Sequence, residues 1–124
     1  AYEKAVENTK GFDCTLIKGW SNQIVKQFED ESLDFVYIDG NHKFEYVIED
    51  IALWSPKVRK GGIVAGHDYQ DWSKTNRWDN MQVKEAVDAW TKVKKISPWF
   101  ITSNNRSNSC NNNILPARLI YSVR

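Results

Sequence analysis

Polar side chains suited to catalysis stand at two places where a buried strand is expected to end. Asp39 and His42 follow the apolar run 34–38, and His67 and Asp68 follow a second apolar run that begins at a pair of glycines. Neither run alternates between apolar and polar residues, which is typical of strands buried on both faces of a parallel sheet. Because ligands bind beyond the carboxyl ends of such strands, the four side chains are candidates for one functional site.

The residue types allow two kinds of chemistry at this site. The carboxylates of Asp39 and Asp68 suit Mg²⁺ or Ca²⁺, and a histidine ligand would also tolerate Mn²⁺, Fe²⁺ or Zn²⁺. Alternatively, His42 or His67 acts as a general base near neutral pH. Simpler interpretations stand beside these. Asp39 can cap a helix that begins near Lys43, and a lone histidine is often a hydrogen-bonded structural residue.

A third polar cluster, Gly19, Trp20, Ser21 and Asn22, follows a short strand expected at 14–19. Trp20 could stack on a flat ligand such as adenine, while the Ser21 hydroxyl and backbone N–H groups bond its edge. The alternative is that Ser21 is the N-cap of the next helix and that Trp20 only packs beside it. The residues alone leave both interpretations open.

Strands and helices alternate along the chain, which predicts an α/β fold with a mostly parallel sheet covered by helices on both faces. Pro56 is expected to end or kink the helix after the second strand, and Asp79 with Gln82 to form a capping box for a later helix. The asparagine-rich segment 103–113 cannot contribute to a core and is predicted to be a flexible loop. The expected strands are 14–19, 34–38, 61–69, 98–102 and 117–123. The last helix is expected to bury Val83, Ala86, Val87, Trp90 and Val93.

The composition is that of one globular domain, residues 1–124. Of the 124 residues, 41% are hydrophobic and 27% charged, and the formal net charge is +1. Proteins that bind nucleic acid by neutralising phosphates usually have a basic excess, and no apolar stretch here is long enough to cross a membrane. Neither a nucleic acid nor a membrane is therefore expected as a partner. Cys14 and Cys110 lie in no metal-binding or redox spacing, which favours reduced thiols and a cytoplasmic location.

The segment from Leu33 to Tyr69 and the later stretch VKEAVDAW resemble the class I S-adenosylmethionine-dependent methyltransferases. The strand endings I-D-G-x-H and G-G-x-x-x-G-H-D-Y are most similar to the small-molecule O-methyltransferase group. The resemblance covers most of residues 15–90. It implies a Rossmann-like, mostly parallel sheet whose C-terminal antiparallel hairpin is formed by 98–102 and 117–123. It also implies methyl transfer from S-adenosylmethionine to a small-molecule acceptor, with a hydroxyl as the expected acceptor group.

The same resemblance assigns roles to the residues of the three clusters. Asp39 matches a position that contacts a metal ion in the metal-dependent members, and we also count it among the cofactor contacts. Asp68 matches a second metal-ligand position, for Mg²⁺ or another divalent ion, whereas His67 stands where those members commonly have an acidic residue. His42 lies close to the place of a catalytic base in some members, so His42 and His67 are the candidate catalytic residues. The segment that touches the adenine of the cofactor matches Gly19, Trp20, Ser21 and Asn22.

The glycine-rich cofactor loop of this family and the acidic residue that holds the ribose do not occur in the sequence. By the resemblance, the chain begins in the helix after the second strand, and the first two strands are missing. Their absence would leave an unpaired sheet edge between 14–19 and 34–38. Three explanations stay open: a fragment, a sheet that has closed up, or a second copy that fills the gap.

Two other functions therefore remain as alternatives. One is a non-catalytic module of the same fold that binds a ligand or self-associates through the exposed sheet edge. The other is a hydrolase or oxygenase that uses the histidines and aspartates at the strand ends with a transition metal.

Overall fold

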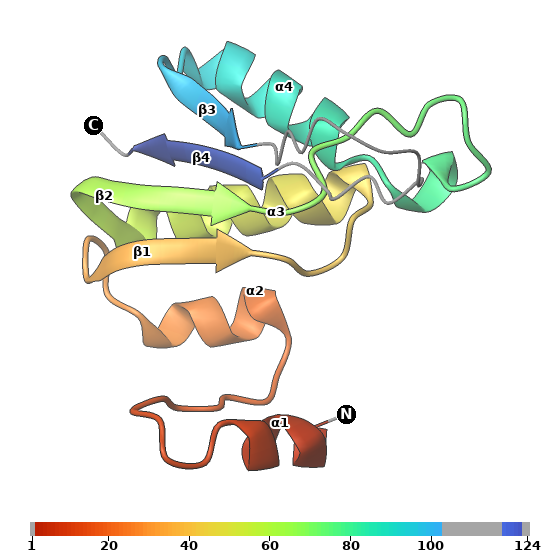
Figure 1. The fold of residues 1–124 in the computed structure, drawn as a ribbon. Helices are drawn as coiled ribbons and strands as arrows, with labels where there is room; N and C mark the ends of the chain where they lie inside the picture. The colour runs from red at the N-terminus through yellow and green to blue at the C-terminus, as the bar shows by residue number, and fades with distance from the viewer. Residues whose placement is uncertain (1, 103–117, 123–124) are drawn as a thin grey trace, which may run out of the picture.

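The computed structural model describes residues 2–102 and the backbone of 118–122 (Figure 1). Short 3₁₀ turns occur at Val25–Gln27, Ser55–Lys57 and Trp78–Asn80. No helix in these ranges is both long and apolar enough to cross a membrane. The helices are α1 (Tyr2–Asn8), α2 (Ser21–Ile24), α3 (Phe44–Trp54) and α4 (Val83–Lys94), and the strands are β1 (Leu33–Ile38), β2 (Val58–Gly66), β3 (Trp99–Thr102) and β4 (Arg118–Ser122).

The four strands form one sheet in the order β1-β2-β4-β3. β1 and β2 are parallel, and β4 runs antiparallel to both β2 and β3. The expected C-terminal strands 98–102 and 117–123 correspond to β3 and β4. The connection between them, which includes the predicted loop 103–113, lies outside the described residues. The fold is therefore α/β, with a parallel strand pair next to an antiparallel pair.

The carboxyl ends of β1 and β2 lie side by side. Ile38, the last residue of β1, pairs with Gly66, the last residue of β2. Asp39 and His67 are the next residues along each strand, so the two polar clusters leave the sheet at the same edge.

The glycine pair lies inside β2 and lets the strand follow β1 closely, whereas the sequence predicted a strand 61–69 that begins at this pair. The register between the two strands shifts between Leu33 and Phe35. Gly61 has a φ of +77°, which favours glycine. A Cβ on Gly62 would lie 2.7 Å from the backbone oxygen of Asp34 and 2.5 Å from Cγ1 of Val58. The register shift within β2 therefore depends on both glycines.

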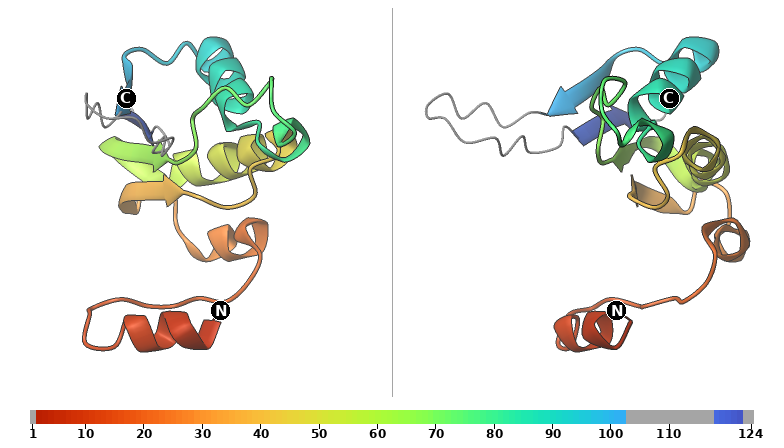
Figure 2. Two further views of the ribbon diagram at one scale, coloured as in Figure 1. Left: turned by 45° about the vertical axis from the view of Figure 1, so that its right-hand side comes forward. Right: turned by 90° about the vertical axis from the view of Figure 1, so that its right-hand side faces the viewer.

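The hydrophobic core lies between the sheet and the two long helices, α3 and α4, which cover one of its faces (Figure 2). On the opposite face the side chains of Phe35, Tyr37 and Ile63 are exposed, and no helix among the described residues buries them. The prediction of helices on both faces is therefore not met within this part of the chain. The buried core residues are Val47, Ile51, Val58, Val64, Val83, Ala86 and Val87.

The prediction of a strand at 14–19 is wrong. These residues form an exposed, extended connection between α1 and α2, and no strand of the described sheet lies beside them to share backbone hydrogen bonds. β1 has β2 as its only partner among the described strands. The side chains of Leu16 and Ile17, which a strand here would have packed against the sheet, accordingly stay exposed.

The helix ends agree with the predictions in one case and differ from them in two others. Pro56 lies in the 3₁₀ turn directly after α3, as expected for a residue that ends a helix. The capping box is wrong, because Gln82 is the N-cap of α4 without a side-chain cap bond. The prediction that Val93 is buried is wrong, because Val93 is 75% exposed. Thr91 is buried instead, and its hydroxyl donates to the Val87 carbonyl.

Candidate functional site

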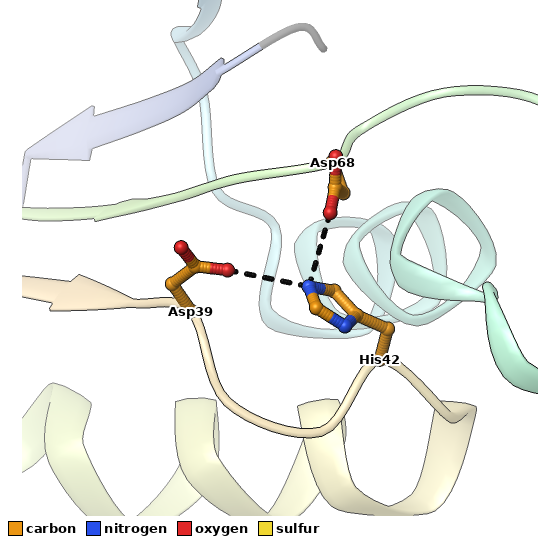
Figure 3. A group of neighbouring side chains, drawn as sticks. All are labelled: Asp39, His42 and Asp68. Carbon is orange, nitrogen blue, oxygen red and sulfur yellow. Dashed lines mark hydrogen bonds and ion pairs between the residues drawn. The ribbon is translucent and has the colours of Figure 1, made fainter. Parts of the chain in front are cut away.

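Two carboxylates converge on one nitrogen of His42 (Figure 3). Nε2 of His42 lies 3.3 Å from Oδ1 of Asp39 and 3.1 Å from Oδ2 of Asp68. The side chain of Asp68 is the most sheltered, at 18% exposure, and that of Asp39 is the most open, at 47%. The three residues come from the end of β1, from the turn before α3 and from the loop after β2, so only the folded sheet brings them together.

His67 extends this cluster by one more pair. Its Nδ1 lies 3.2 Å from Oδ1 of Asp68, so the two oxygens of Asp68 face two different histidines. Ionised carboxylates only accept hydrogen bonds. The contact with Asp39 therefore assigns a hydrogen to Nε2 of His42. In the neutral tautomer the lone pair is then on Nδ1 of His42.

The turn that carries His42 is held from two sides. The N–H of Gln82 donates to the carbonyl oxygen of His42 at 2.8 Å, and the N–H of Phe44 donates to Oε1 of Gln82 at 3.1 Å. Within the turn, the N–H of Lys43 donates to Oδ1 of Asn41. The start of α4 thus fixes the start of α3. Asp39 is not the cap of α3, because its carboxylate faces His42 and Lys43 is the N-cap.

Asp68 has a backbone conformation that is uncommon for a residue with a side chain. Its φ is +58°, in the left-handed region. Such a conformation is maintained where surrounding contacts require it. Here it directs the carboxylate between His42 and His67.

The cluster has the composition of a divalent-metal site. Asp39, His42 and Asp68 each offer one ligand atom, and these atoms all lie within 4.8 Å of one another. Two carboxylate oxygens and one imidazole nitrogen suit Mn²⁺, Fe²⁺ or Zn²⁺ as well as Mg²⁺. The same arrangement also suits a histidine base that is oriented by acids. His67 does not belong to the group of three possible metal ligands.

A groove of about 730 Å³ lies beside this cluster. Trp20 stands at its side with an indole that is 76% exposed. The turn at Gly40 and Asn41 forms another wall, so the groove adjoins the residues that carry His42. All four residues of the third predicted cluster line it, together with Gln23, Gly40, Asn41, Tyr46, Glu49 and Asp50.

Asp39 does not line the groove of Trp20. It lines a second groove of about 410 Å³ between β1, α2 and α3. Ser21, Gly40 and Asp50 line both grooves, which makes them neighbouring parts of one depression along β1. The structure therefore brings together the four residues at the strand ends, and it places Gly19 to Asn22 on the adjoining wall.

Ser21 is not an N-cap, contrary to one interpretation of the sequence. It is the first residue of α2, Trp20 precedes it as the N-cap, and no side chain caps the helix. The hydroxyl of Ser21 instead donates to Oδ1 of Asp50 at 2.6 Å and accepts the indole N–H of Trp54 at 2.8 Å. The carboxylate on α3 lies within reach of the hydroxyl only in the folded protein, so sequence alone could not distinguish this from capping.

Asp50 is a residue of the site that sequence reasoning missed. It is 8% exposed, and burial raises the pKa of its carboxyl, while the Ser21 hydrogen bond lowers it and the charge of Glu49 raises it. A signal was available in the helical spacing. Asp50 lies between Val47 and Trp54 on the same stripe of α3, where an apolar residue is expected.

Comparisons with known proteins identify a family and a fold. A family described as "Methyltransferase domain" matches residues 3–69, more than half of the 124 residues. A protein of Acanthamoeba polyphaga mimivirus is 39% identical over 70 residues, which are 54% of this chain and 29% of that protein.

Solved structures with the same fold have little sequence identity to the chain. A SAM-dependent methyltransferase from Archaeoglobus fulgidus matches with a TM-score of 0.62 at 14% identity, over 97% of this chain and 72% of that one. A protein from Corynebacterium glutamicum matches with a TM-score of 0.58 at 14% identity, over 98% of this chain and 54% of that one. At such identities the likeness shows the fold alone.

The chain thus spans 29% of the length of its mimivirus relative and 54% of the Corynebacterium protein. Since the family match extends over more than half of its residues, and its fold is that of a SAM-dependent methyltransferase, the chain belongs to the methyltransferase domain family.

Proposed function

We propose that this chain takes part in methyl transfer from S-adenosylmethionine to a hydroxyl group of a small molecule, with His42 as the base. The observation that carries the proposal is the imidazole of His42, which two carboxylates contact and which directly follows Gly40 and Asn41, two residues that line an open groove. The family supports the cofactor. A base suits a hydroxyl acceptor, because a hydroxyl must lose its proton when its oxygen is methylated.

The groove of Trp20 has the character of a site for the adenosyl part of the cofactor. Its volume of about 730 Å³ lies within the range of small-molecule sites. An exposed indole offers a flat apolar surface on which a purine can stack. When bound, S-adenosylmethionine supplies a methyl group activated by its positively charged sulfur. The protein's own part is to bind the cofactor and orient the acceptor beside it.

The proton of the acceptor hydroxyl would move to Nδ1 of His42. Asp39 and Asp68 keep the other nitrogen, Nε2, as the hydrogen-bond donor, and they stabilise the positive imidazolium that forms. His67 lies near one carboxylate oxygen, whereas His42 lies near two. His42 is therefore the preferred base of the two.

A divalent metal ion would be held by Asp39 and Asp68, with His42 as a further ligand once Nε2 loses its hydrogen. The donor set fits such an ion, and when bound it would lower the pKa of the acceptor hydroxyl. A titration with Mn²⁺ or Mg²⁺ tests this role. Saturable binding that disappears in Asp68→Asn supports it, and binding that persists in both Asp39→Asn and Asp68→Asn would contradict it.

Cofactor binding is tested first, by calorimetric titration of the chain with S-adenosylmethionine in the presence and absence of Mg²⁺. We expect saturable binding that weakens about tenfold in Trp20→Ala, through loss of stacking. Phe12→Ala is the matched control, because Phe12 is 73% exposed and lines neither groove. A titration without saturable binding would contradict the proposal that this chain has a cofactor site.

The base is tested by turnover in a protein that carries this domain and methylates an acceptor. His42→Gln should lower kcat by roughly 10²–10⁴-fold without changing the Kd for S-adenosylmethionine, because the base acts on the acceptor. His67→Gln is the matched control and should lower kcat much less. A larger loss in His67→Gln would move the role of base to His67.

A second candidate function is self-association through β1. Its outer edge has no partner among the described strands, and Phe35 and Tyr37 are 53% and 42% exposed beside it. Light scattering over a wide range of protein concentration should show a dimer that Phe35→Lys dissociates, while Phe12→Lys leaves it intact. A monomer at every concentration would rule out this function.

A further inference from the structure

Asp50 occupies a position in α3 where a carboxylate is costly to place. It is 8% exposed, and its neighbours Val47 and Ile51 belong to the buried core. A buried carboxylate needs hydrogen bonds to remain in such a place. The partners of Asp50 therefore indicate what its carboxylate does.

One oxygen of Asp50 receives a directed chain of hydrogen bonds from α3 through α2. The indole N–H of Trp54 donates to Oγ of Ser21, and Oγ of Ser21 donates to Oδ1 of Asp50. A hydroxyl has one hydrogen, so the hydrogen of Ser21 is engaged inside the protein. A ligand in the groove cannot receive it while this chain is intact.

The other oxygen of Asp50 lies against the turn that carries His42. A Cβ added to Gly40 would come within 3.1 Å of Oδ2, so the turn passes directly over the carboxylate. Next to Asp50, Oε1 of Glu49 accepts from the amide of Asn22 at 3.3 Å. Two consecutive acids of α3 thus contact two consecutive residues of α2, and Asp50 also contacts the turn.

We propose that Asp50 is a positioning residue that fixes both walls of the cofactor groove, the segment Gly19–Asn22 and the turn at Gly40, relative to α3. Ser21 belongs to the scaffold of the site, and its hydroxyl does not donate to a ligand. This inference rests on the proposed function for its link to the cofactor. The positioning itself is a property of the chain without any ligand.

The experiment follows hydrogen exchange of the chain by NMR, at the Trp54 indole N–H and at the backbone N–H groups of Gln23, Ile24, Lys43 and Gln82, which donate to Trp20, Asn41 and His42 in the two walls. Asp50→Ala removes the acceptor of the Ser21 hydroxyl and should speed exchange at these groups about tenfold, the effect of losing one hydrogen bond. Asp50→Asn keeps an acceptor oxygen and should retain most of the protection. Glu45→Ala is the matched control, because Glu45 is an exposed acid in the first turn of α3.

The same variants are then titrated with S-adenosylmethionine. We expect Asp50→Ala to bind about tenfold more weakly and Asp50→Asn to bind nearly as the parent chain does. Unchanged exchange at the backbone N–H groups of Gln23, Ile24, Lys43 and Gln82 in Asp50→Ala would overturn the inference. If neither the parent chain nor any variant binds the cofactor, while exchange still rises in Asp50→Ala, the positioning role stands and the proposed function fails. Ser21→Ala removes the acceptor of the Trp54 indole N–H but leaves Asp50, so it should speed exchange of that indole N–H. This variant shows how much of the change is local to the hydrogen bond and how much reflects general unfolding.

Discussion

The hydroxyl of Ser21 and the carboxylate of Asp50 share one hydrogen bond beneath the groove, and neither role was visible in the residue types. A serine before a helix has the properties of a cap, and an aspartate in a helix has those of a solvated surface residue. Both expectations concern sequence neighbours. The partners are 29 residues apart in the chain, and α3 places them 2.6 Å apart.

At the residue scale, the buried carboxyl of Asp50 makes stability depend on pH. Burial, the largest cause, raises the pKa of Asp50 in the folded protein. A folded pKa above the unfolded one means that the contribution to stability is full below the unfolded pKa and is lost as the pH rises through the folded pKa. Asp50→Asn does not ionise and escapes this loss. The unfolding free energy of Asp50→Asn, relative to the parent chain, should therefore rise with pH.

Urea unfolding of both proteins, from about pH 3 upward to about pH 7, measures this difference. Glu45→Gln removes an exposed carboxylate from the same helix and should show no such trend. A difference that stays constant over the range, or falls as the pH rises, would contradict the assignment of the shift to Asp50.

At the element scale, the glycine pair within β2 determines how the two strand ends meet. The glycine pair allows the register shift against β1, and after the shift Ile38 pairs with Gly66. This pairing places the residues after each strand at one edge. A side chain at either glycine would change the pairing of β2 with β1 and so move the strand ends that carry the site.

Gly62→Ala should lower the unfolding free energy by about 1–3 kcal/mol, the usual cost of an overpacked position. Its Cβ would lie 2.5 Å from Cγ1 of Val58, 2.7 Å from the Asp34 oxygen and 2.9 Å from the Arg59 oxygen. Urea denaturation followed by circular dichroism measures the change. Lys60→Ala, at an exposed residue of the same strand, is the control and should change stability by less than about 0.5 kcal/mol. Equal stability of Gly62→Ala and the parent chain would show that β2 can shift to accept a methyl group.

At the scale of the whole molecule, stability comes from one side of the sheet. α3, α4 and β2 share the buried cluster, whereas α1 buries no residue and the opposite face of the sheet exposes Phe35 and Tyr37. The apolar side chains of the first twenty residues should therefore contribute little to unfolding free energy. Those of α3 should contribute most.

Ile51→Ala and Ile17→Ala test this asymmetry with the same chemical change. Ile51 is 3% exposed in the core cluster, and its truncation should cost about 2–5 kcal/mol of unfolding free energy. Ile17 is 46% exposed, and its truncation should cost less than about 0.5 kcal/mol. The midpoints of urea unfolding compare them directly. A comparable loss in Ile17→Ala would mean that the first segment packs against a surface in solution.

The sequence by itself determined the strands β1 and β2, the helices after them, and the four side chains that follow the strand ends. Continuous apolar runs and helical spacing are local properties, and polar residues directly after a parallel strand must lie at the edge of its sheet. Tertiary structure decided the rest. The 14–19 segment is apolar enough for a strand but has no neighbour to pair with, and backbone hydrogen bonds require one. Which nitrogen of His42 faces both carboxylates, and which acid receives the Ser21 hydroxyl, depends on contacts between residues that are distant in the chain.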